Sequence, residues 1–166
     1  MRRGQTMKPL AICFLALIPV LALAQDKPKP QKLTAGAIQI EPIESGDIVI
    51  PAEFRYAIYE RLLERVKADG EFKQVFRSGD RTAKGVPDLV ILKTKISRFN
   101  QGSQTQRELT TVTGGTRIDV KATVERKSGG VLLNNDITGR VRFFGENLGV
   151  TNDLAKRIAK ILKESF

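Results

Sequence analysis

The sequence contains no histidine, and it has a single cysteine, Cys13. Without histidine the chain lacks the commonest general base, the commonest metal ligand and every nucleophile that serine or cysteine forms with histidine. Because Cys13 lies inside the apolar N-terminal run, the rest of the chain offers no thiol for a disulfide or a thiolate metal site. We therefore expect a protein that is not an enzyme and that carries no cofactor and no metal ion.

The sequence also lacks an apolar run of the roughly 20 residues that a membrane-spanning helix needs. Its longest apolar run covers only residues 10–23, and cationic residues at positions 2, 3 and 8 come before it. The triplet Ala22-Leu23-Ala24 precedes Gln25 and has the small-x-small form that signal peptidase accepts. This pattern predicts a cleavable signal peptide over residues 1–24 and a periplasmic or secreted protein, with a retained membrane anchor as the alternative.

Lysine and proline dominate the residues that follow the signal peptide. Residues 25–32 read QDKPKPQK, which is typical of a flexible or polyproline-like tether, and we expect one folded domain over residues 33–166. The chain has a net charge of +10, of which the signal peptide holds three cations and no acid, so the exported form is near +7. Outside the cytoplasm such a charge favours an envelope protein or an anionic envelope polymer as partner, with no nucleic acid, and it allows peripheral membrane association.

Hydrophobic periodicity predicts two amphipathic helices. Between Pro51 and about Asp69 apolar side chains recur every four residues, and Gly70 ends the pattern. A second apolar stripe predicts a C-terminal helix that begins near Thr151 or Asn152, either of which could cap it.

Short extended patterns predict the strands. They cover residues 37–43, 72–76, 88–99, 117–127 and 131–144. Contiguous apolar residues at 89–92 predict a central strand that is covered on both faces, whereas residues 117–127 alternate between apolar and charged. The turn at residues 128–130 predicts a hairpin, in which residues 134–136 are a candidate bulge. The order β-α-β-β-β-β-α predicts an α+β fold with two layers, in which a mixed sheet of about five strands carries both helices on one face.

The candidate binding residues lie on the hairpin and in the polar segment before it. The predicted residues are Gln104, Gln106, Arg107, Arg117, Lys121, Arg140 and Arg142. The hairpin cations could bind a polyanion, but Asp119 and Glu125 are interleaved with them, so a solvated and charge-balanced face is the alternative. The segment 100–113 is long for a connection in a compact domain, which suggests a recognition loop. An additional edge strand explains the same residues equally well.

The order of these elements resembles an uncharacterised bacterial envelope family, domain of unknown function forty-four ten. The resemblance covers residues 37–162 and rests on RYAIYERLLERVKADGEFKQVF, PDLVILKTKISRFNQGSQTQR, TRIDVKATVERKSGGVLLNNDITGRV and NDLAKRIAKIL. It also rests on the placement of Gly102, Gly114, Gly115 and Gly130. That family has no established activity, and its organisation is similar to the periplasmic domains of curli-secretion lipoproteins and to the N-terminal domain of the Tol-system periplasmic protein. The resemblance therefore implies a non-enzymatic binding or assembly module of the bacterial envelope.

Overall fold

The computed structural model describes residues 32–100, 115–141 and 149–166. The predicted signal peptide and all but the last residue of the predicted tether lie outside these ranges, as does most of the polar segment before the hairpin. In chain order the elements are β1 (Ala37–Ile40), α1 (Ala52–Asp69), β2 (Gln74–Arg77), the short helix η1 (Arg81–Ala83), β3 (Leu89–Asn100), β4 (Thr116–Arg126), β5 (Val131–Val141) and α3 (Gly149–Ser165).

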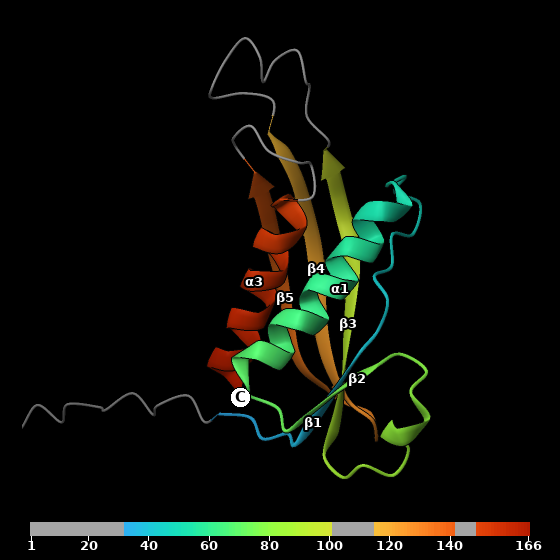
Figure 1. The fold of residues 1–166 in the computed structure, drawn as a ribbon, viewed down its shortest axis with the longest axis vertical. Helices are drawn as coiled ribbons and strands as arrows, with labels where there is room; N and C mark the ends of the chain where they lie inside the picture. The colour runs from blue at the N-terminus through green and yellow to red at the C-terminus, as the bar shows by residue number, and fades with distance from the viewer. Residues whose placement is uncertain (1–31, 101–114, 142–148) are drawn as a thin grey trace, which may run out of the picture. The chain divides into compact units, whose positions relative to one another are not determined.

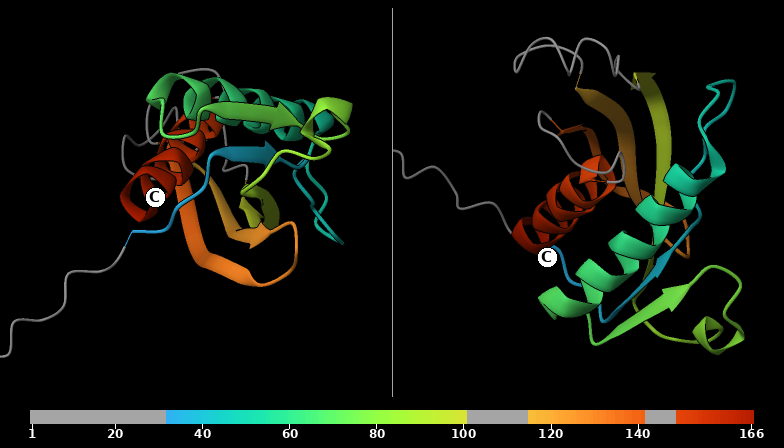
Figure 2. Two further views of the ribbon diagram at one scale, coloured as in Figure 1. Left: turned by 90° about the horizontal axis from the view of Figure 1, so that it is seen from below. Right: turned by 45° about the horizontal axis from the view of Figure 1, so that its top comes forward.

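The strands form one mixed five-stranded sheet in the order β2-β1-β3-β4-β5. β1 is parallel to both β2 and β3, whereas β3, β4 and β5 are antiparallel neighbours. Both long helices lie on the same face of this sheet (Figures 1 and 2). The predicted two-layer α+β fold is therefore confirmed, with its order β-α-β-β-β-β-α.

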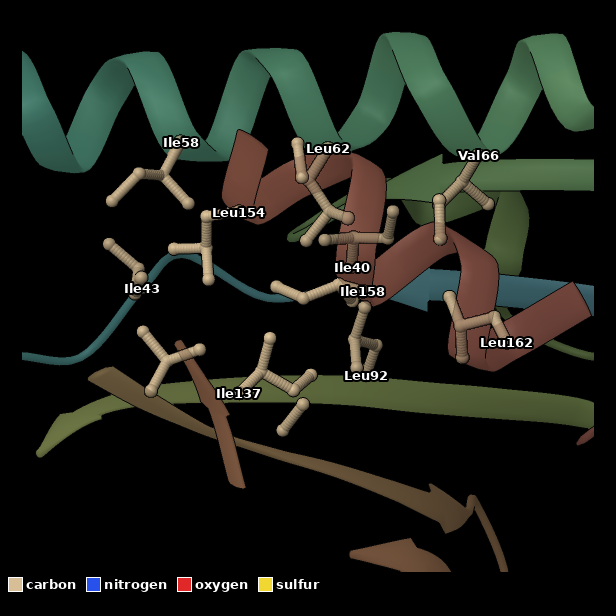
Figure 3. Close-up of a cluster of buried hydrophobic side chains, with 14 of the residues drawn as sticks. Ile40, Ile43, Ile58, Leu62, Val66, Leu92, Ile137, Leu154, Ile158 and Leu162 are labelled. Atoms are coloured by element: carbon tan, nitrogen blue, oxygen red, sulfur yellow. The ribbon is translucent and has the colours of Figure 1, made fainter. Parts of the chain in front are cut away.

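The core fills the space between the two helices and the sheet. The helices contribute Phe54, Ile58, Leu62, Leu63 and Val66 from α1, and Val150, Leu154, Ala155, Ile158, Ala159 and Leu162 from α3. Figure 3 shows that Leu62 and Leu162 point from the helices towards the sheet, where Ile40 and Leu92 lie. Burial of these apolar side chains is the main term that stabilises the fold.

The two helices differ in how well their ends were predicted. α1 follows Pro51 directly and ends at Gly70, whose φ of 68° is in the left-handed region that glycine adopts without strain. α3 already includes Gly149 and Val150, so the prediction that Thr151 or Asn152 caps its start is wrong. The helix extends further because Val150 is fully buried and Thr151 is only 1% exposed, and packing against the core holds this first turn.

The prediction that β3 is covered on both faces is wrong over most of its length. Val90, Leu92 and Ile96 are buried beneath the helices, whereas Lys93 and Lys95 between them are exposed. The opposite face is covered only where β3 begins, by a small cluster made of Ala37, Phe76, Ala83 and Leu89. Consecutive residues of β3 are apolar at its start because Val90 and Leu92 pack in the large core beneath the helices, while Leu89 packs in the small cluster on the opposite face.

Two irregularities set the register of the long strands. In β3 the pairing with β4 shifts at Ser97, so that Ile96 and Phe99 both face the core. In β5 the shift lies beside Leu132, whereas residues 134–136 pair regularly with residues 121–123. The predicted bulge at 134–136 is therefore misplaced, because the irregularity follows the tight turn of the hairpin.

Gly139 marks the point where α3 comes closest to the sheet. A Cβ atom at this position would lie 2.9 Å from Cβ of Leu154 and 3.2 Å from the carbonyl oxygen of Val150. The second neighbour is backbone, which cannot turn aside as a long side chain can. The absence of a side chain at residue 139 therefore allows the first turns of α3 to pack on β5.

Candidate functional site

The helices leave the opposite face of β3, β4 and β5 open, and we call this surface the outer face. Along β4 the core-facing residues Ile118, Val120 and Val124 are buried, while Lys121 between them is exposed. The charged and hydroxyl residues of the outer face are Lys93, Lys95, Arg98, Arg117, Asp119, Lys121, Thr123, Glu125, Asp136, Thr138 and Arg140. The apolar and charged alternation predicted for the hairpin thus separates core from solvent.

The register places two lysines directly opposite each other on the outer face. Lys95 of β3 is paired with Lys121 of β4, and Asp136 of β5 is on the other side of Lys121. Within the described ranges, neither ammonium group makes an ion pair or a hydrogen bond. Like charges directly opposite each other destabilise a sheet, and Asp136 on the other side of Lys121 offsets part of that repulsion.

A shallow hollow of about 170 Å³ surrounds this pair. It is lined by Glu44, Lys93, Thr94, Lys95, Lys121, Thr123 and Glu125. Lys93 Nζ lies 2.6 Å from Glu125 Oε2, and this hydrogen bond raises the pKa of Lys93. Lys93 and Glu125 therefore largely compensate each other, and Lys95 and Lys121 are the cations of this hollow that form no ion pair with a described residue.

A second charged cluster surrounds Asp119 at the other end of the outer face. Its carboxylate accepts hydrogen bonds from Arg117 Nε at 2.9 Å and from Thr138 Oγ1 at 2.6 Å, and Arg98 Nε lies 3.9 Å away. Partial burial acts to raise the pKa of Asp119, but the hydrogen bonds from Arg117 and Thr138 outweigh it, and the pKa is lowered. Asp119 is thus held as an anion that engages Arg117.

Arg140 has a structural contact through its backbone. Its N–H donates to Oδ2 of Asp153 at 3.0 Å, and the same oxygen accepts from Arg157 Nε at 2.8 Å. This contact ties the free edge of β5 to α3. The Arg140 side chain makes no ion pair with any described residue, and it lies opposite Arg117 in the hairpin.

The structure brings three of the predicted binding residues onto one surface. Arg117, Lys121 and Arg140 all belong to the outer face, whereas Gln104, Gln106, Arg107 and Arg142 lie outside the described residues. Whether the segment before the hairpin is a loop or an edge strand also lies outside them. Sequence reasoning missed Lys95, although Lys93 and Lys95 alternate with the apolar residues of β3 and could have been assigned to an open face.

Three further observations concern metal binding, buried polar atoms and membrane-spanning helices in the described part of the chain. Its acidic residues form no group of three that could hold a metal ion. Every buried side-chain nitrogen or oxygen in residues 32–100, 115–141 and 149–166 has a hydrogen-bond partner. No helix in these ranges is both long enough and apolar enough to cross a membrane.

No protein-family model and no curated protein matches the chain. Among solved structures, the fold is similar to that of the PelC dodecamer from Paraburkholderia phytofirmans, with a TM-score of 0.59 and 11% identity over 78% of this chain and 91% of that chain. A variant of the same dodecamer gives a TM-score of 0.58 at 11% identity, over 77% and 86% of the two chains. An uncharacterised protein gives 0.52 at 10% identity, over 81% and 95%. At these identities the likeness shows a shared fold and nothing more.

Proposed function

We propose that this chain is a non-enzymatic, exported binding and assembly module that takes an acidic component of the bacterial envelope on its outer face. The proposal rests mainly on Lys95 and Lys121, which lie opposite each other in the sheet and form no ion pair with a described residue, although the register places Asp136 beside Lys121. A bound carboxylate or phosphate would relieve their repulsion and would gain charge-assisted hydrogen bonds. The hollow around them leaves room for such a group.

Two further observations support an envelope role, and a third supports assembly. The N-terminal sequence has the form of a signal peptide, which supports a periplasmic or secreted location. The element order resembles the envelope family forty-four ten and, through it, the curli-secretion and Tol-system domains. The fold is also similar to that of PelC, whose solved structure is a dodecamer, and this supports assembly with further copies of the chain as part of the proposal.

Charge reversal on the outer face tests the proposal. The double variant Lys95→Glu/Lys121→Glu is expected to lose the partner at least about tenfold in crosslinking from the native envelope, because each lysine would otherwise donate a charge-assisted hydrogen bond. The matched control is Arg55→Glu/Lys67→Glu on exposed positions of α1, which changes the net charge equally. Equal capture by the two variants would contradict the proposal, and substrate turnover by the purified protein would exclude a non-enzymatic role.

An anionic polymer that binds the same lysines is the second candidate partner. Binding of purified lipopolysaccharide and cell-wall polymer, measured at increasing salt concentrations, distinguishes a polymer from a protein partner. A polymer held by many separated charges is lost steeply as salt rises, because the Debye length falls to about 8 Å at physiological ionic strength. A protein partner that also buries apolar surface keeps most of its affinity.

If the chain is exported, its N-terminal residue after cleavage of the leader can be predicted. Protein produced with its native leader is expected to begin at Gln25, because Ala22 and Ala24 fit the peptidase subsites. Intact-mass measurement checks this directly. A product that retains residues 1–24 would remove the argument for an envelope partner and would restore nucleic acid as a candidate.

A further inference from the structure

The solvent-exposed side of α3 carries an excess of positive charge that α1 does not share. α1 has four basic residues and four acidic ones, whereas α3 has four basic residues, Lys156, Arg157, Lys160 and Lys163, against only Asp153 and Glu164. All four basic side chains of α3 are exposed. The helix dipole favours cations near the C-terminal end of α3, but it acts equally on α1, whose charges are balanced, so the excess on α3 distinguishes the two helices.

The acidic residues of α3 are already engaged. Asp153 pairs with Arg157 at 2.8 Å, and Glu164 lies 3.6 Å from Lys160. Lys156 and Lys163 have no acidic partner among the described residues. Because residues spaced by three and four positions share one side of a helix, Lys156, Lys160 and Lys163 form a single row, which we call the α3 lysine row.

The start of the described chain lies at one end of this row. Leu33 N donates to the carbonyl oxygen of Ser165 at 2.8 Å, and Lys32 Nζ donates to that of Lys163 at 3.3 Å. Figure 1 shows the first described residues beside the C-terminal end of α3. Lys32 thus places a further ammonium group at the C-terminal end of α3.

We infer that the α3 lysine row docks on an anionic phospholipid surface. The apolar side of α3 is buried in the core, so the attraction is electrostatic, between ammonium groups and lipid phosphates. α3 packs on the face of the sheet opposite the outer face, so a membrane on the solvent side of α3 leaves Lys95 and Lys121 accessible to the partner proposed above.

Vesicle cosedimentation of the exported protein tests this inference. Wild-type protein is expected to bind phosphatidylcholine vesicles that contain phosphatidylglycerol, and to stay in solution with pure phosphatidylcholine. The triple variant Lys156→Glu/Lys160→Glu/Lys163→Glu is expected to bind at least about 100-fold more weakly, since each basic residue near an anionic surface contributes about fivefold. Raised salt should weaken wild-type binding in the same way.

The matched control is Arg55→Glu/Arg61→Glu/Lys67→Glu on α1, which makes the same charge change and likewise breaks one intrahelical ion pair. It should bind vesicles as wild type does, and unchanged urea midpoints show that both variants are folded. The neutral variant Lys156→Gln/Lys160→Gln/Lys163→Gln repeats the test if charge reversal unfolds the chain.

Three results with the wild-type protein and the helix variants would overturn the inference. These are no binding of wild type to the anionic vesicles, equal loss in the α3 and α1 variants, and tighter binding to soluble polyphosphate than to the vesicles. The variant Lys95→Glu/Lys121→Glu should keep full vesicle binding, so failure of the outer-face proposal and failure of this one are distinguishable. Loss of vesicle binding in that variant alone would make the membrane an outer-face ligand and would also overturn the role of α3.

Discussion

Replacement of Leu62 or Leu162 by alanine is expected to lower the free energy of unfolding by about 2–5 kcal/mol. Leu62 is 1% exposed and Leu162 is 2% exposed, and both belong to the single large core beneath the sheet. Truncation removes buried methyl groups and leaves a cavity that neighbouring elements fill only in part. Urea unfolding followed by circular dichroism gives the change as a shift of the midpoint.

Surface positions of the same two helices supply the controls for this prediction. Glu64 follows Leu63 on α1, Lys163 follows Leu162 on α3, and both side chains are exposed. Alanine at either position should change the free energy of unfolding by no more than about 0.5 kcal/mol. A core variant whose midpoint equals that of its surface control would mean that the helix does not pack where the structure places it.

Gly139→Ala is expected to destabilise the protein by about 1–3 kcal/mol, although it adds only one methyl group. The new Cβ would stand 2.9 Å from Cβ of Leu154 and 3.2 Å from the Val150 carbonyl oxygen, so α3 would have to move away from β5. Such a displacement also disturbs the contact between Arg140 and Asp153. Thermal and urea unfolding measure the loss.

Gly36→Ala is the matched glycine substitution. A Cβ at Gly36 meets nothing within 4 Å, and its φ is not in the left-handed region. Alanine there should be neutral, or stabilising by up to about 1 kcal/mol through a less flexible unfolded chain. If both variants shift the midpoint equally, the close approach of α3 at residue 139 is not the cause.

Local pattern predicted most of the fold because burial follows the period of each element. The four-residue recurrence of Phe54, Ile58, Leu62 and Val66 gave α1 to within a residue, and the alternation over residues 117–127 gave the two faces of β4. Tertiary packing decided the rest. The first turn of α3 forms because Val150 fits the core, two residues before the start that the sequence predicted.

The candidate site was only partly predictable, since it depends on register between strands. Alternation alone placed Lys121 on an open face. Its neighbour Lys95 depends on how β3 aligns with β4, and a one-residue slip would turn every side chain to the other face. That alignment shifts at Ser97, where no residue pattern signals an irregularity.

The packing of α3 on β4 and β5 has a consequence for the order in which the protein can fold. Leu154, Ile158 and Leu162 come from the last residues of the chain, and Leu33 N at the start of the folded unit bonds to the carbonyl oxygen of Ser165 at its end. A nascent chain that stops before Gly149 therefore has nothing to cover the inner side of β4 and β5. Such a chain exposes aggregation-prone apolar surface once β4 and β5 have been made, and the domain reaches its folded state only after α3 has been synthesised.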